Sequence, residues 1–177
     1  NDEVRYAALL ILLSRSKIFP DVYSYWKNLC NKLSNSNSYQ RSIGILLIAE
    51  NIKWDAQNQF ENIADVYLSC CDDEKFITAR QTIQSISKWV IYKQSLIPVI
   101  VDKLTKIDLS KRSDSQHKLL LMDIVNIMIE IQKIEPNPDL EKYIFDTITG
   151  GYLDKKFLKK IEGIFGVGDL RQFSKDN

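Results

Sequence analysis

The sequence is poor in the residues that most enzyme sites require. Its 177 residues include one histidine, His117, and three cysteines, Cys30, Cys70 and Cys71. A catalytic triad that uses histidine would have to include His117. The cysteines lack the spacing of a zinc site, and an odd number with two adjacent is no disulfide framework. We therefore expect no catalytic residue, no metal site and no cofactor, and thiols that stay reduced in a cytoplasm.

An excess of one charge and a long hydrophobic run are also missing. The chain has 24 Lys and Arg against 23 Asp and Glu, a net charge of +1. Near-neutrality argues against a protein whose main role is to coat nucleic acid. The longest apolar runs, residues 7–13 and 43–49, are far shorter than the roughly 20 residues that span a bilayer, so we expect no membrane partner. The chain begins inside a helical pattern, without a methionine or a signal peptide, and we expect a cytoplasmic segment of a longer protein.

Glycine and proline are scarce as well, and their scarcity favours helices. Only six glycines and four prolines interrupt the chain. Apolar residues recur at spacings of three and four, as in the stripe of Val22, Trp26 and Leu29, which we expect to be core. No stretch alternates apolar and polar residues for long enough to form a strand. The sequence predicts an all-α fold.

Two landmarks repeat along the chain with one period. The basic residues Arg5, Arg41, Arg80 and Lys118 follow one another at spacings of 36, 39 and 38 residues. Each lies one turn into an expected helix, and the expected N-caps are Asp2, Ser38 and Ser113, the last in an S-x-x-Q capping box. Three prolines, Pro20, Pro98 and Pro138, begin the second helix of their units, and Phe60 takes the corresponding place in the remaining unit.

This period divides the chain into helical hairpins. We expect four units, over residues 2–35, 38–72, 75–110 and 113–149. Neither helix of a unit can bury its apolar face alone, so the units stack into an α-solenoid with one continuous core. The tail, residues 150–177, opens at Gly150 and Gly151 and is expected to cap the last edge with an amphipathic helix over 153–165.

A period near 38 with a basic residue early in the first helix resembles HEAT repeats and their armadillo relatives. A bacterial family of HEAT-like proteins, often uncharacterised and sometimes labelled SufBD-like, is similar in three segments: Asn51-Ile52-Lys53-Trp54-Asp55, Asp73-Glu74-Lys75-Phe76-Ile77-Thr78-Ala79-Arg80-Gln81 and Ile107-Asp108-Leu109-Ser110. The resemblance implies an α–α superhelix over residues 2–149. It implies no activity and no site residue.

The repeated cations and two tryptophans are the candidate partner-binding residues. If the units stack in register, Arg5, Arg41, Arg80 and Lys118 form a row that could bind phosphates or an acidic peptide. Trp54 and Trp89, near the ends of first helices, could stack on a base or anchor a peptide. The alternative is structural: the cations pair with acids on second helices, for which Asp65, Asp102 and Asp146 are available, and the tryptophans pack in the core.

Two further features have structural interpretations. The acidic run Asp72-Asp73-Glu74 falls between two units, where carboxylates cap the next helix. Cys70 and Cys71 end a helix, so one is expected in the core and one at its edge.

Two functions remain open. The first is a non-catalytic binding scaffold that presents a solenoid surface to a protein or peptide. The alternative is a nucleic-acid-binding HEAT-like protein, similar to the DNA glycosylases that act on alkylated bases, with the row of cations, Trp54, Trp89 and Asp55 as its groove. The oligomeric state is left open.

Overall fold

The computed structural model describes residues 2–151, 153, 155 and 158–159. In this part of the chain every regular element is a helix, which confirms the all-α class. The chain divides into two compact units after Arg112. The expected capping helix over 153–165 lies almost entirely outside the described residues.

The first unit contains three long helices, each followed by shorter helical segments. The long helices are α1 (Asp2–Ser16), α3 (Ser38–Asn51) and α5 (Phe76–Trp89). The segments that follow α1 are η1 (Asp21–Tyr25) and α2 (Trp26–Cys30). After α3 come η2 (Ile52–Trp54), η3 (Gln59–Asn62), α4 (Ala64–Ser69) and η4 (Cys70–Asp72). After α5 come η5 (Val90–Tyr92), η6 (Gln94–Leu96), α6 (Ile97–Thr105) and η7 (Leu109–Lys111).

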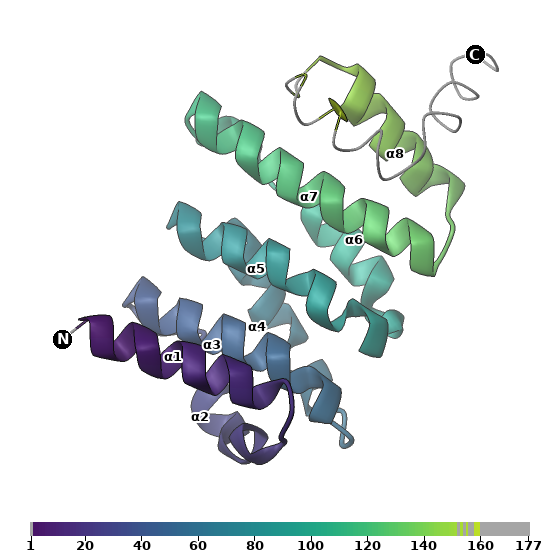
Figure 1. Cartoon of the computed structure of the whole chain (residues 1–177). Helices are drawn as coiled ribbons and strands as arrows, with labels where there is room; N and C mark the ends of the chain where they lie inside the picture. Colours follow the sequence, from purple (N-terminus) through teal and green to yellow (C-terminus); the bar gives the residue numbers. More distant parts are fainter. Residues whose placement is uncertain (1, 152, 154, 156–157, 160–177) are drawn as a thin grey trace. The chain divides into compact units, whose positions relative to one another are not determined.

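The three long helices lie side by side, with α3 in the middle (Figure 1). α3 packs against α1 on one side and α5 on the other, and α2 also packs on α3. Side chains from α3 and α5 are fully buried, among them Ile45, Ile48, Ile83 and Ile86. Burying these branched apolar side chains supplies most of the stabilisation of such a layer.

An aromatic cluster fills the space behind α5. Phe60, Tyr67 and Trp89 are fully buried and meet edge to face, with ring centroids 4.8 to 5.8 Å apart. Aromatic rings prefer this arrangement because the positive edge of one meets the negative face of another. Phe60 comes from η3, Tyr67 from α4 and Trp89 from the end of α5, so the cluster joins the segments that follow α3 to α5.

The second unit is described by a helical hairpin, α7 (Asp114–Ile134) and α8 (Pro138–Thr149), which pack against each other. Asn137 caps α8: its side chain accepts hydrogen bonds from the backbone N–H groups of Asp139 and Leu140. Pro138 occupies the first turn, where its missing N–H costs nothing.

One expected N-cap is wrong, and another occupies the N-cap position without making a side-chain cap hydrogen bond. α3 is capped by Asn37, not Ser38, and the Asn37 side chain accepts a hydrogen bond from the Tyr39 N–H at 2.9 Å. Ser113 does occupy the N-cap position of α7, but its side chain makes no cap hydrogen bond, so the predicted capping box does not form. Asn and Ser are nearly equal as caps, so composition alone could not choose between neighbours.

Candidate functional site

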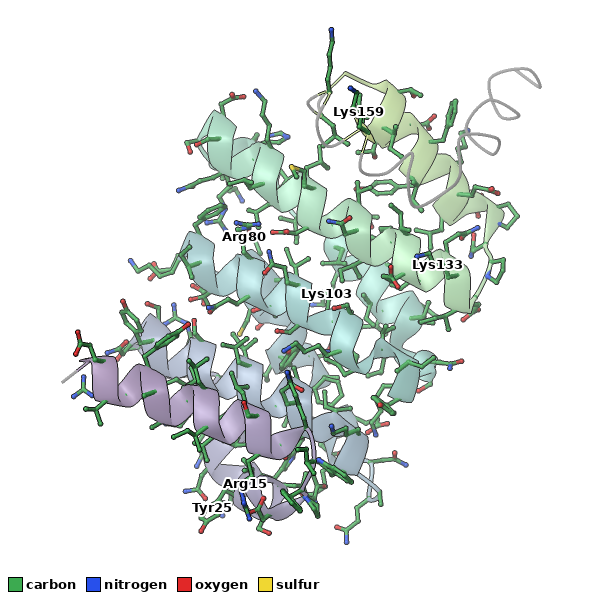
Figure 2. All side chains as sticks on the ribbon, in the orientation of Figure 1. Arg15, Tyr25, Arg80, Lys103, Lys133 and Lys159 are labelled. Carbon is green, nitrogen blue, oxygen red and sulfur yellow. The ribbon has the colours of Figure 1, made fainter. Side chains whose placement is uncertain are left out.

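An open groove runs along α1 in the first unit. It has a volume of about 940 Å³. One wall is α1, the other is η1 with the end of α2 and Lys32 after it, and α3 lies beneath. The lining side chains are mostly apolar: Ala8, Leu9, Leu12, Val22, Tyr25, Leu29, Ile43 and Leu47. Arg15 and Tyr25, which line it from the two walls, are labelled in Figure 2. This size lies within the range of about 300–1,000 Å³ that ligand sites occupy.

The groove exists because the segment after α1 is too short to cover it. α1 has 15 residues, whereas η1 and α2 have 5 each. Gly44 fixes where α2 rests on α3: a Cβ there would lie 2.8 Å from the Lys32 Cβ and 3.1 Å from the Leu29 carbonyl oxygen. α2 is therefore held tightly on α3, and the side of α1 that carries Leu12 stays open.

The charged side chains that line the groove are mainly cationic. Three cations, Arg5, Arg15 and Lys32, line the groove together with one carboxylate, Asp21. Arg15 forms an ion pair with Asp21, and its hydrogen bond lowers the pKa of that carboxyl. Lys32 hydrogen-bonds the side-chain oxygen of Gln40. An apolar trough with positive edges is suited to a ligand that combines apolar side chains with negative charge.

This groove was not expected from the sequence, although one of its lining residues, Arg5, was a candidate binding residue. The available signal was α1 itself, which is apolar at nearly every position of residues 6–13. A helix that is apolar all round is normally buried, so a partly exposed helix with this pattern presents an apolar face to solvent. The second wall, which η1 forms with Tyr25, could not be predicted, because it depends on how η1 packs in three dimensions.

Arg41, the second cation of the predicted row, is held in a local network. Its guanidinium makes a bidentate ion pair with Asp73, at 2.6 Å from Nε and 2.8 Å from Nη2. It also donates to the carbonyl oxygens of Asn35 and Ser36. The acid is thus Asp73 in the following turn, and not the second-helix residue Asp65. Such paired geometry is strong and directional, and it ties two loops together.

The other predicted cations have different surroundings. Arg80, labelled in Figure 2, lies on α5 with its guanidinium 5.7 Å from the centre of the Phe76 ring. Lys118 pairs with Asp114 one turn earlier in α7, and both side chains are exposed. Arg5 is exposed on α1 and lines the groove. Whether these residues bind a partner stays a prediction.

The tryptophans divide between core and edge. Trp26 is buried, as its apolar stripe predicts. Trp89 is fully buried in the aromatic cluster, so in this conformation it presents no surface to a partner. Trp54 is half-buried, and its indole N–H donates to the carbonyl oxygen of Ser16 at 2.8 Å. That bond anchors the end of α1 to η2.

Asp55, the carboxylate of the glycosylase-like alternative, is fully engaged in buried contacts. Oδ1 accepts from the Tyr23 hydroxyl at 2.7 Å and from the Gln59 N–H at 2.8 Å. Oδ2 accepts from the Phe60 N–H at 2.8 Å and pairs with the Lys93 ammonium at 3.2 Å. Burial raises the pKa of Asp55, but these hydrogen bonds outweigh it, and the net pKa lies below the ordinary value. Both oxygens are thus occupied in stabilising the turn before η3.

Lys93 is the centre of the same network and was missed in the sequence. Besides Asp55, its ammonium contacts Glu61 at 3.0 Å and the side-chain oxygen of Asn58 at 2.8 Å. Asn58 adopts a left-handed conformation with φ of 54°, which the turn requires. These contacts satisfy all three ammonium hydrogens of a nearly buried lysine.

The cysteines, His117 and the acidic run show no catalytic arrangement. Cys70 and Cys71 are both buried, which corrects the expectation that one would be peripheral, and burial raises the pKa of all three thiols. A reactive cysteine needs the opposite shift. His117 is half-buried in a shallow hollow of the second unit. Asp73 accepts from the Lys75 N–H as well as pairing with Arg41, but it provides no cap to α5.

The described residues contain neither a metal-binding cluster nor a membrane-spanning helix. No group of three or more histidine, cysteine, aspartate and glutamate side chains is placed to hold a metal ion within them. None of the helices they form has both the length and the hydropathy to cross a membrane.

Comparison with models of protein families, with curated proteins and with solved structures finds no match to this chain.

Proposed function

We propose that the chain is a HEAT-like solenoid that acts as a non-catalytic scaffold and binds a protein segment in the groove along α1. The segment is an amphipathic peptide whose apolar side chains enter the groove and whose acidic side chains meet Arg5, Arg15 and Lys32. The observation that carries the proposal is the groove itself: a preformed apolar trough with three cations and one carboxylate. Grooves of this kind receive the apolar face of a helix.

The repeat architecture is supported by hydrogen bonds that span one period of the sequence. The Lys88 ammonium reaches Glu50, 38 residues earlier. The Lys53 ammonium reaches the carbonyl oxygen of Lys17, 36 residues earlier. Arg112 donates to the carbonyl oxygen of Glu74, again 38 residues earlier. A stack of similar units in register produces contacts at one fixed separation, because each unit touches only its neighbours.

A nucleic-acid role receives less support from the contacts. Arg41 and Lys118 are paired with carboxylates, and Asp55 is enclosed by four partners. Binding to a phosphate backbone depends on cations that release counterions, and its affinity falls steeply as salt rises. Fluorescence anisotropy of a labelled DNA duplex at low salt tests this alternative, and clear salt-dependent binding would favour it over the peptide proposal.

The peptide proposal is tested with a phage-displayed library of random peptides selected on the immobilised chain. We expect enriched sequences that combine apolar residues at helical spacing with Asp and Glu. Binding of a labelled selected peptide should be lost in Leu12→Glu, which places a charge in the groove. The matched control is Val66→Glu, an exposed residue of α4 outside the groove, and it should bind normally.

Two results would contradict the proposal. One is a selection that yields only basic or sequence-unrelated peptides. The other is equal loss of binding in Leu12→Glu and Val66→Glu, because that would place the peptide outside the groove.

A further inference from the structure

The two ends of the groove hold their cations differently. At one end, Lys32 follows α2 and meets Gln40 in the first turn of α3, and both residues line the groove. At the other end, Arg15 in the last turn of α1 meets Asp21 at the start of η1, and both line it as well. The partner of each cation decides how much positive charge a ligand meets at that end.

These two positions lie at opposite ends because α1 and α3 run in the same direction. The Trp54 indole donates to the carbonyl oxygen of Ser16, which joins the last residue of α1 to the segment after α3. Tyr6 near the start of α1 and Gln40 near the start of α3 line one small hollow. Arg15 comes nine residues after Tyr6 in α1, which corresponds to about 14 Å along the helix.

The charge of Arg15 is already matched within the chain. Its guanidinium forms an ion pair with the Asp21 carboxylate and lies 5.0 Å from the centre of the Phe19 ring. The hydrogen bond from Arg15 lowers the pKa of Asp21, so this carboxylate is charged at neutral pH. Oδ1 of Asp21 also accepts from the Val22 N–H at 3.1 Å, which helps to hold the carboxylate in place. A ligand carboxylate therefore has to displace Asp21 before it reaches Arg15.

Lys32 has a neutral partner instead. Its ammonium donates a hydrogen bond to the side-chain oxygen of Gln40, which carries no charge. An ammonium has three hydrogens to donate, and an amide oxygen that accepts one of them leaves the positive charge uncompensated. A ligand carboxylate can join or replace Gln40 and form a charge-assisted hydrogen bond, which is stronger than the bond to the amide.

We propose that Lys32 selects the acidic residue of the ligand and that Asp21 masks Arg15 at the other end of the groove. This inference rests on the proposed binding of an acidic amphipathic peptide and adds where the acid of that peptide lies. The peptide places a carboxylate at the end where α3 begins, and its apolar side chains extend along α1. Selectivity then depends on one cation and one internal competitor, and not on all the cations equally.

The probe for this proposal is a labelled peptide with at least two acidic residues, taken from the selection on the immobilised chain. Lys32→Gln should raise its dissociation constant about tenfold in fluorescence anisotropy, because a hydrogen bond between charged groups is lost. Arg15→Gln should change it less than about threefold, since Asp21 already neutralises Arg15. The matched control is Lys27→Gln on α2, where the side chain is exposed and outside the groove, and it should bind normally.

Removal of the internal competitor should strengthen binding. Asp21→Asn should lower the dissociation constant at least about threefold, because Arg15 becomes available to a second acidic side chain of the peptide. The gain should disappear when Arg15→Gln is added, since it acts through Arg15. Asp65→Asn, at an exposed position of α4 outside the groove, changes the net charge equally and should leave binding unchanged. A peptide with Asn and Gln in place of Asp and Glu should not respond to Lys32→Gln, which separates recognition of charge from damage to the fold.

Three outcomes overturn the inference. Equal losses in Lys32→Gln and Arg15→Gln do so, as does an Asp21→Asn variant that binds no more tightly than the wild type. If Leu12→Glu still abolishes binding in these two cases, the peptide occupies the groove and the proposed function stands. If the selection yields no acidic peptide, the proposed function and this inference are both wrong.

Discussion

Replacing Lys93 by methionine should destabilise the first unit by about 3 kcal/mol, the lower end of the roughly 3–5 kcal/mol measured when one partner of a buried ion pair is removed. The pair is deeply buried, since the side chains of Lys93 and Asp55 are 5% and 0% exposed. Methionine keeps most of the apolar part of the lysine side chain, so the substitution mainly removes the positive charge. The lower end applies because Asp55 still accepts hydrogen bonds from Tyr23, Gln59 and Phe60.

Urea unfolding followed by tryptophan fluorescence measures this effect in the right part of the chain. All three tryptophans, Trp26, Trp54 and Trp89, lie in the first unit, so the signal reports on that unit. The matched control is Lys106→Met. Lys106, at the C-cap of α6, pairs with Asp102 one turn earlier, and both side chains are mostly exposed. Loss of this ion pair should lower the free energy of unfolding by less than about 0.5 kcal/mol.

Two results would refute the reasoning. The first is a cost for Lys93→Met below about 1 kcal/mol, or one no larger than that of Lys106→Met, because the pair would then not behave as buried. The second concerns coupling: Asp55→Asn combined with Lys93→Met should cost less than the sum of the single changes by about 1–3 kcal/mol. Additive costs would show that the two groups do not depend on each other.

Three further predictions concern single contacts in the same unit, each measured by urea unfolding. Gly44→Ala should lower the free energy of unfolding by about 1–3 kcal/mol despite the better helix propensity of alanine, because the new Cβ meets Lys32 at 2.8 Å; a gain in stability would contradict this close approach. Arg41→Lys should cost about 1–2 kcal/mol, since a lysine cannot make the bidentate pair with Asp73, and a neutral result would show that one contact suffices. Asp55 should contribute to the free energy of unfolding above about pH 4, and this contribution should disappear as the pH falls through the lowered pKa of the folded state, because the carboxyl of the unfolded chain takes up its proton at a higher pH. Asp55→Asn should lack this pH-dependent part of the stability.

The sequence contained enough information to find the helices. Arg5, Arg41, Arg80 and Lys118 all lie in the first turns of long helices, α1, α3, α5 and α7. Local spacing and the scarcity of glycine and proline were sufficient for this, because helix formation depends on residues three and four apart. Cap assignment failed at Ser38, where the neighbouring Asn37 was an equally good candidate.

The contacts of these residues were harder to predict than their positions. Trp54 directly follows α3 in η2 and Trp89 is the last residue of α5, yet only Trp89 is fully buried. Trp89 is more deeply buried because it packs against Phe60 of η3 and Tyr67 of α4, which precede it by more than 20 residues. Burial of a large side chain depends on such distant neighbours, which a local pattern does not record.

The pairing of Lys93 with Asp55 did leave a trace in the sequence. The two residues are 38 positions apart, which is one period of the proposed repeat. Residues at equivalent places in adjacent stacked units are neighbours, so a cation and an acid one period apart are candidates for an ion pair. The repeated cations show the period through residues of the same charge, whereas the ion pair joins residues of opposite charge, Lys93 and Asp55.

Tyr23 connects this stabilising network to the proposed binding groove. Its hydroxyl donates to Asp55, which in turn pairs with Lys93, while its backbone lies in η1 between the groove-lining residues Val22 and Tyr25. The groove wall is therefore fixed to the end of α3 and to the following hairpin rather than left to move with its own short turn. A wall that is already ordered loses little conformational entropy when a ligand binds, which raises affinity without any added contact. We therefore expect that loss of these buried polar groups would weaken binding in the proposed groove as well as the stability of the fold.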